Sequence, residues 1–147
     1  MNQPKYQLKA GDKLSTYEFL SEGPKGKIEK LIQFTTTNYH DVYNLAFGDK
    51  NGITGQIDDK VISNNGDSEI VLATVVSALY AFTDKYPNAW IYATGSTKSR
   101  TRLYRMGISK YLKDVQNDFE VFGQVGKKWE SFEKGIEYQS FLVKRKN

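Results

Sequence analysis

The chain has 147 residues, of which 39% are hydrophobic and 26% charged, a size and composition typical of one compact domain. It contains no cysteine, which excludes a disulfide framework, a cysteine-ligated zinc site, a thiol nucleophile and an iron–sulfur cluster. The only histidine is His40, so a histidine-rich metal site is also excluded. We therefore expect a single folded domain over residues 1–147, without a metal or a resident cofactor.

The first 13 residues are polar, and we expect them to form an irregular lead-in to the fold. They lack the apolar core of a signal peptide, and no apolar stretch in the chain is long enough to span a bilayer. These features favour a cytoplasmic protein with no membrane contact.

A run of strands is predicted after this lead-in. Turn signals occur in GPKG at 23–26 and in GDKNG at 48–52, and the segments around them are rich in β-forming residues. The four predicted strands cover residues 15–21, 27–37, 40–47 and 53–62.

The hydrophobic pattern then changes to that of helices alternating with strands. Residues 70–82 are almost entirely apolar, which predicts a buried helix capped by Asp67 or Ser68. A short strand at 89–94 precedes a second helix that starts near 95–97 and reaches about Val115. Two more strands are predicted at 119–125 and 136–145. The order ββββαβαββ indicates an α+β fold, with a mainly antiparallel sheet and two helices.

The positive charge is concentrated in one segment. Between Lys85 and Lys113 there are seven basic residues and no acidic one, so removing them from the net charge of +4 leaves −3 on the rest of the chain. Three of the four arginines of the chain lie in this segment, within GSTKSRTRLYR at 95–105. Because the guanidinium group binds carboxylate and phosphate through two parallel hydrogen bonds, this clustering suggests contacts with an anion.

On a helical wheel the basic residues of the second helix separate from its apolar residues. Tyr104 and Tyr111 fall on the apolar side, whereas Arg100 stands apart and is expected to be partly buried. The strand-to-helix turn adds two hydroxyl groups at a place where backbone N–H groups favour anions. The predicted anion- or partner-binding residues are Ser96, Thr97, Lys98, Arg100, Arg102 and Arg105.

Three alternatives stay open for this face. The first is an ordinary solvated surface, which is common for basic helix faces. The second is a nucleic-acid-binding surface, since Tyr111 adds an aromatic ring to the cations, but the signal is weak because no nucleic-acid-binding motif is present. The third alternative is an acidic protein partner or a small anionic ligand, which we favour.

The residues 95–105, together with FEVFG at 119–123, resemble a family of small uncharacterised bacterial proteins found mostly in Bacteroidetes. The features shared with that family are a GS-x3-RTRLYR segment and a following strand of the FEVFG kind. The resemblance brings no established activity with it.

The predicted topology is also similar to the later part of the GNAT acetyltransferase fold. Leu103 and Tyr104 match the end of the N-x-x-A-x-x-L-Y pattern of the last GNAT helix, and the resemblance implies that Tyr104 would act as the general acid. Acetyl-CoA would then be the cofactor. The segment VISNNGDSEI, at 61–70, departs from the glycine-rich pyrophosphate loop of that family, and its Asp67 and Glu69 would repel a diphosphate.

From the sequence we therefore expect a non-catalytic interaction module that binds an acidic partner or an anion through the basic helix. A GNAT-type N-acetyltransferase and a nucleic-acid-binding protein are the alternatives.

Overall fold

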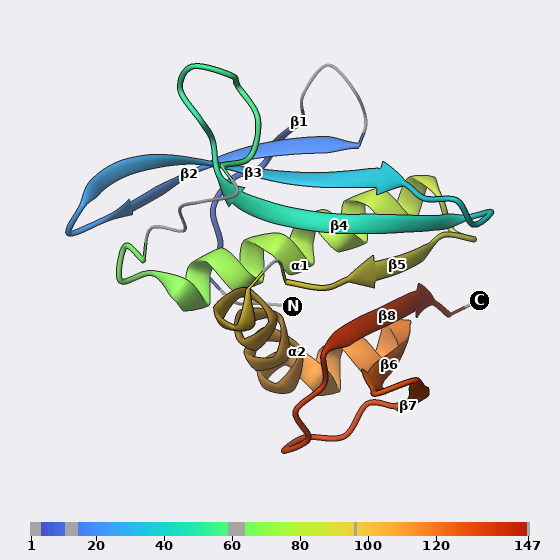
Figure 1. Cartoon of the computed structure of the whole chain (residues 1–147). Coiled ribbons are helices and arrows are strands. Elements are labelled where there is room, and N and C mark those ends of the chain that lie inside the picture. The colour runs from blue at the N-terminus through green and yellow to red at the C-terminus, as the bar shows by residue number, and fades with distance from the viewer. Residues whose placement is uncertain (1–3, 11–14, 59–63, 96, 147) are drawn as a thin grey trace. The chain divides into compact units, whose positions relative to one another are not determined.

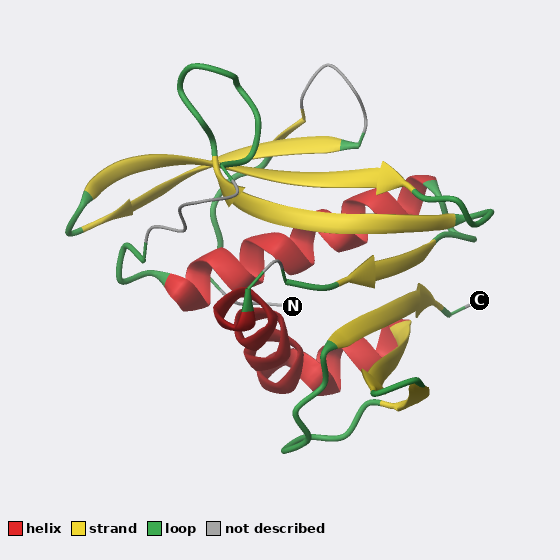
Figure 2. Cartoon of the chain, in the orientation of Figure 1, coloured by secondary structure: helices red, strands yellow, loops and turns green. Residues whose placement is uncertain are grey.

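The computed structural model describes residues 4–10, 15–58, 64–95 and 97–146 (Figure 1). Within these residues, strands and two long helices alternate along the chain (Figure 2). The elements are β1 (Lys9–Ala10), β2 (Thr16–Gly23), β3 (Gly26–Thr36), β4 (Val42–Asp49), α1 (Ser68–Lys85), β5 (Trp90–Ala93), α2 (Lys98–Asp118), β6 (Phe119–Val125), β7 (Lys128–Ser131) and β8 (Ser140–Arg145). This order confirms the predicted α+β class, the two helices and the mainly antiparallel pairing.

The chain forms two compact units. The first contains residues 1–34 and 46–82, and the second contains residues 35–45 and 83–147. Both β4 and α1 therefore contribute residues to each unit. The single domain over the whole chain stays a prediction.

In the first unit the strand order is β1-β2-β3-β4, and β2 and β3 form the predicted hairpin around GPKG, with Gly23 opposite Gly26. Helix α1 packs on this sheet through its apolar side. The ring of Phe82 stacks on that of Phe34 in β3, with centroids 4.2 Å apart, and Tyr17 meets Phe34 edge-on. Alternate residues of β2 are buried, as expected for a strand with one face on the core, whereas β3 buries three consecutive residues, Lys30, Leu31 and Ile32.

A polar network joins the hairpin to the start of α1. The buried Asn65 side chain donates to the Gly26 carbonyl at 2.9 Å and accepts the Lys25 amide at 2.7 Å. The Asp67 carboxylate accepts hydrogen bonds from the hydroxyls of Ser21 at 2.5 Å and Tyr6 at 2.6 Å. Each of these polar groups is satisfied locally, which allows the side chain of Asn65 to be buried.

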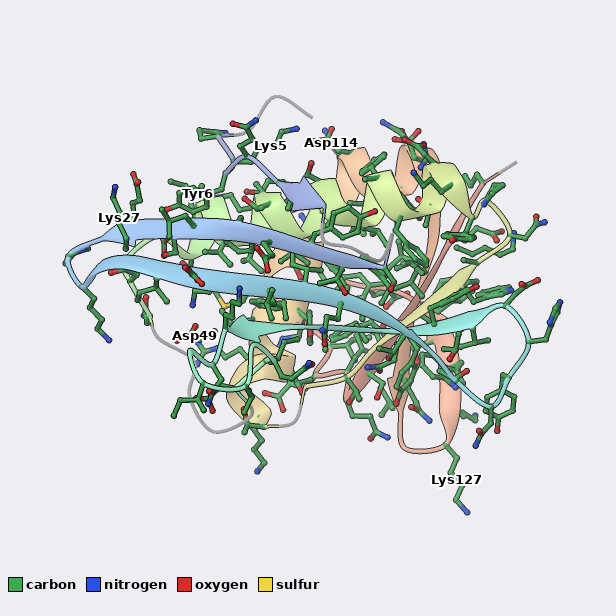
Figure 3. All side chains as sticks on the ribbon, turned by 90° about the horizontal axis from the view of Figure 1, so that it is seen from above. Lys5, Tyr6, Lys27, Asp49, Asp114 and Lys127 are labelled. Carbon is green, nitrogen blue, oxygen red and sulfur yellow. The ribbon has the colours of Figure 1, made fainter. Side chains whose placement is uncertain are left out.

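Tyr6, which is labelled in Figure 3, belongs to the segment predicted to be an irregular lead-in. Its backbone N–H donates to Thr74 in α1 at 2.8 Å, and its ring stacks on Phe19 in β2. The following residues, Lys9 and Ala10, pair with β2 as the short strand β1. The polar composition of this segment did not predict that it would pack on the fold, because the packing depends on the ring and the hydroxyl of a single residue, Tyr6.

The first unit also buries an ion pair. The Lys30 ammonium group in β3 lies 2.5 Å from the Asp49 carboxylate at the end of β4, and their side chains are 3% and 11% exposed. Asp49 is labelled in Figure 3. Nearby, the more exposed Lys50 reaches Glu18 at 3.2 Å, and this carboxylate raises the pKa of Lys50.

The predicted strand over 53–62 is wrong for residues 53–58, which form a turn and a single bridge between Lys50 and Ile57. The Asn51 side chain accepts the amides of Ile53 at 2.8 Å and Thr54 at 3.0 Å, and Gly55 has a φ of 73°. An Asx turn of this kind offers the backbone an alternative to strand pairing. Residues 59–62 lie outside the described residues.

In the second unit the strand order is β4-β5-β8-β6-β7. The first residues of β4 pair in parallel with β5, whereas β5, β8, β6 and β7 are antiparallel neighbours. Strand β7 was not predicted, because its four residues, KWES, are mostly polar and too few to show a strand pattern. The hairpin between β6 and β7 turns at Gly126 and Lys127 (Figure 3).

Helix α2 leads directly into β6. Its apolar side chains are buried as predicted, with Tyr104, Tyr111 and Val115 at most 7% exposed. Its backbone departs from helical geometry at Tyr111, where φ is −104° and ψ is 16°. The last turn is closed by Lys146, whose N–H donates to the Asp118 carbonyl at 2.7 Å.

Candidate anion-binding site

A cavity of about 540 Å³ opens in the second unit, between the start of α2 and the chain that enters β8. Its volume is within the range of small-molecule sites. Helix α2 and the residue preceding it line one wall with polar and basic side chains, namely Thr97, Lys98, Thr101, Arg102 and Arg105. We call this space the α2 cavity.

The local sequence explains how these side chains come together. Strand β5 ends at Ala93, and the first intrahelical hydrogen bond of α2 runs from the Thr101 amide to the Thr97 carbonyl at 3.1 Å. The Thr101 hydroxyl accepts the Gly95 amide at 3.2 Å, which fixes the turn between β5 and α2. Residues 98, 102 and 105 then recur at helical spacing, so their side chains lie on one face of α2.

The charges of α2 run against its own dipole. Its first turn has no acidic residue and its last turn no basic one, whereas Lys98 stands at the start and Asp118 at the end. Cations near a helix N-terminus are electrostatically unfavourable, since that end already bears partial positive charge. Lys98 in the first turn is therefore electrostatically unfavourable for the helix, and a bound anion would offset this cost.

Two of these cations have no carboxylate partner in the described part of the chain. Lys98 and Arg102 are exposed, and neither forms an ion pair there. Arg105 is more enclosed, with a side chain that is 25% exposed, and its guanidinium lies 4.0 Å from the Glu137 carboxylate. The cavity lining thus carries three positive charges and one negative charge, a net formal charge of +2.

The opposite wall consists of Glu137, Tyr138 and Gln139, and Thr94 and Gly95 complete the lining. Tyr138 fixes this wall, because its side chain is buried against Gly123, where an added Cβ would overlap the tyrosine ring. Its hydroxyl donates to Glu130 and accepts the Glu133 amide, both at 3.0 Å. Gln139 is held through its backbone, as its carbonyl accepts the Thr94 hydroxyl at 3.1 Å.

Burial raises the pKa of Tyr138 above its ordinary value, and the nearby Glu130 carboxylate raises it further. The neutral phenol therefore stabilises the folded state below pH ~10, and this contribution is lost as the pH rises through the folded-state pKa. We expect Tyr138→Phe to be about 1 kcal/mol less stable than the wild type at pH 8. The difference should shrink above pH ~10, as measured by urea denaturation at a series of pH values. A difference that is constant up to pH ~11 would contradict this role for the phenol.

The structure places the predicted site residues as follows. Thr97, Lys98, Arg102 and Arg105 line the α2 cavity. Ser96 and the side chain of Arg100 lie outside the described residues, so the predicted partial burial of Arg100 stays a prediction. The cavity is also lined by Thr94, Thr101 and residues 137–139, which were not predicted. Of these, only Thr101 could have been predicted from the sequence, because its hydroxyl lies within the basic segment.

Tyr104, the general acid implied by the GNAT resemblance, is not part of the cavity lining. Its side chain is 7% exposed, and its hydroxyl lies 3.5 Å from the Leu45 carbonyl in β4. His40 is a surface residue, with a side chain that is 95% exposed beside Asp41.

Among the described residues, no group of three or more histidine, aspartate or glutamate side chains is placed to hold a metal ion. In the same part of the chain, neither helix has the length and apolar character needed to cross a membrane.

Comparison with known proteins places the chain in a family without adding an activity. No curated protein and no solved structure matches it. One family model, described as a family of unknown function, matches residues 2–146, which is nearly the whole chain. The chain therefore belongs to DUF6934, a family of unknown function.

Proposed function

We propose that this protein is a non-catalytic binding module of the cytoplasm, and that its α2 cavity takes an anionic group of a small ligand or an acidic partner. The observation that carries the proposal is the cavity lining itself. It holds three cations against one carboxylate, in a chain whose residues outside 85–113 have a net charge of −3. Positive charge is thus concentrated where a concave surface can surround an anion.

The chemistry of the lining suits phosphate or carboxylate. Arg102 offers a planar pair of N–H donors, and Lys98 adds a mobile point charge one helical turn earlier. The first amides of α2 precede the hydrogen bond from the Thr101 amide to the Thr97 carbonyl, and N–H groups at such a helix start bind a capping group or an anion. These donors surround an anion without any group that would act on it chemically.

The acetyltransferase alternative receives less support from the described residues. In the segment that would replace the pyrophosphate loop, Asn65 and Asp67 direct their side chains into hydrogen bonds with the β2–β3 hairpin and Tyr6. Tyr104 has its hydroxyl at a backbone carbonyl. An acetyltransferase would require acetyl-CoA to stabilise the protein against heat.

A thermal-shift screen tests the proposal. Pyrophosphate at ten times its Kd should raise the Tm of the wild-type protein by about 3–6 °C, because the ligand binds the folded state alone. Lys98→Ala/Arg102→Ala should lose this shift. Lys113→Ala is the matched control: Lys113 is an exposed lysine of the same helix that lies beyond Tyr111 and does not line the cavity. That variant should keep the shift.

Other outcomes of the screen would indicate a different function for the basic face of α2. Equal losses in the double variant and in Lys113→Ala would indicate general attraction to a basic helix face, the behaviour expected of a nucleic-acid binder. In that case the affinity for an oligonucleotide should fall steeply with added salt. A shift with acetyl-CoA that survives Lys98→Ala/Arg102→Ala would support the acetyltransferase. No shift with pyrophosphate, phosphate or citrate would contradict the proposed anion site.

A further inference from the structure

The α2 cavity contains one acidic side chain among its basic ones. The Glu137 carboxylate lies 4.0 Å from the Arg105 guanidinium, at the outer limit of an ion pair, and its side chain is 89% exposed. An exposed pair at this separation contributes little to stability. Glu137 is therefore not explained by the stability of the fold.

The two residues that follow Glu137 are fixed. Tyr138 is 2% exposed, and its ring packs against Phe132 and Phe141. The Gln139 amide donates to the Gln124 carbonyl of β6 at 3.0 Å. The backbone next to Glu137 is therefore held in place, and Glu137 lines the same cavity as the basic residues of α2.

A carboxylate in this position has opposite effects on two classes of ligand. It repels a simple anion and weakens the field of Lys98 and Arg102. It attracts a ligand that carries an ammonium group beside its anionic group, because each charge of such a ligand then meets a group of opposite sign. The mixed lining thus matches a zwitterion better than an anion.

We propose that the α2 cavity selects a small zwitterion, with Lys98 and Arg102 binding its anionic group and Glu137 accepting its ammonium group. This inference rests on the proposed anion site and names its ligand class. Glu137 is a specificity-determining residue in this account, and it takes no part in any chemical step.

Paired probes that differ by one amine test the inference. Titration calorimetry with O-phosphoethanolamine and ethyl phosphate should show about five- to tenfold tighter binding of the amine-bearing probe by the wild-type protein. β-Alanine and propionate form the corresponding carboxylate pair and report which anionic group is preferred. Glu137→Gln should remove the preference in both pairs and should bind ethyl phosphate more tightly than the wild type does.

A matched control is Glu133→Gln, which removes a charge from an exposed glutamate of the same loop that does not line the cavity. It should keep the preference. Equal binding of the two probes within each pair by the wild type would overturn the zwitterion selection and leave the anion site intact. If no probe binds the wild type, both the anion site and the selection are wrong. A preference that survives Glu137→Gln would assign the amine to another acceptor and overturn the role of Glu137.

Discussion

Asp49→Ala should lower the free energy of unfolding by about 3–5 kcal/mol, the largest single effect that we expect in this protein. The carboxylate of Asp49 lies 2.5 Å from the ammonium group of Lys30, and the lysine side chain is only 3% exposed. Removing the carboxylate leaves a buried positive charge that has lost this partner, and the cost of burying an ion is then no longer offset. Urea denaturation followed by circular dichroism at pH 7 measures the change.

Two further variants separate the buried charge from the packing around it. Lys30→Met/Asp49→Leu replaces both charges with apolar groups and should be markedly more stable than Asp49→Ala, since no charge stays buried without this partner. Glu22→Ala removes the carboxylate of an exposed pair, which lies 4.0 Å from Lys27, and should change stability by less than about 1 kcal/mol. If Asp49→Ala costs no more than Glu22→Ala, the pair is not buried in solution.

The second large effect is expected for Gly123→Ala, which should destabilise the protein by about 3 kcal/mol. Gly123 lies in β6 directly beneath the ring of Tyr138, and a methyl group there would overlap three ring carbons. Tyr138 is 2% exposed and its hydroxyl is engaged by Glu130, so the ring has no free space into which it can move. The variant should also weaken pyrophosphate binding, because Tyr138 supports one wall of the α2 cavity.

Gly52→Ala is the control for this substitution. Nothing lies within 4 Å of the position that its Cβ would occupy, so the change should alter stability by less than about 0.5 kcal/mol. Thermal unfolding followed by calorimetry compares both variants with the wild type. A Tm for Gly123→Ala within 1–2 °C of that of Gly52→Ala would contradict the close packing of Tyr138 on β6.

The elements with strong local signals could be predicted from the sequence. Helix α1 is apolar around most of its circumference, and the GPKG turn set the hairpin between β2 and β3. The predictions of elements failed where a few specific contacts override the local composition. Asn51 replaces a predicted strand with an Asx turn, and Tyr6 anchors a segment that reads as a polar tail.

The candidate site was predictable on one wall only. Lys98, Arg102 and Arg105 recur at helical spacing, and arginine is clustered around them. This local pattern was enough to predict them as binding residues without knowledge of the rest of the fold. The other wall lies more than thirty residues later in the sequence, and its position beside α2 depends on the packing of Tyr138. The burial of Lys30 could not be predicted for a related reason. A lysine in a strand is usually exposed, and only its ion pair with Asp49 accounts for its burial.

The most direct test of the anion site is a titration of the ¹⁵N-labelled protein with pyrophosphate, followed by amide chemical shifts. We expect saturable shifts centred on residues 94–105 and 137–139, and their loss in Lys98→Ala/Arg102→Ala. Shifts that spread evenly over the basic residues of the whole chain, or that are centred on the segment before α1, would contradict the anion site.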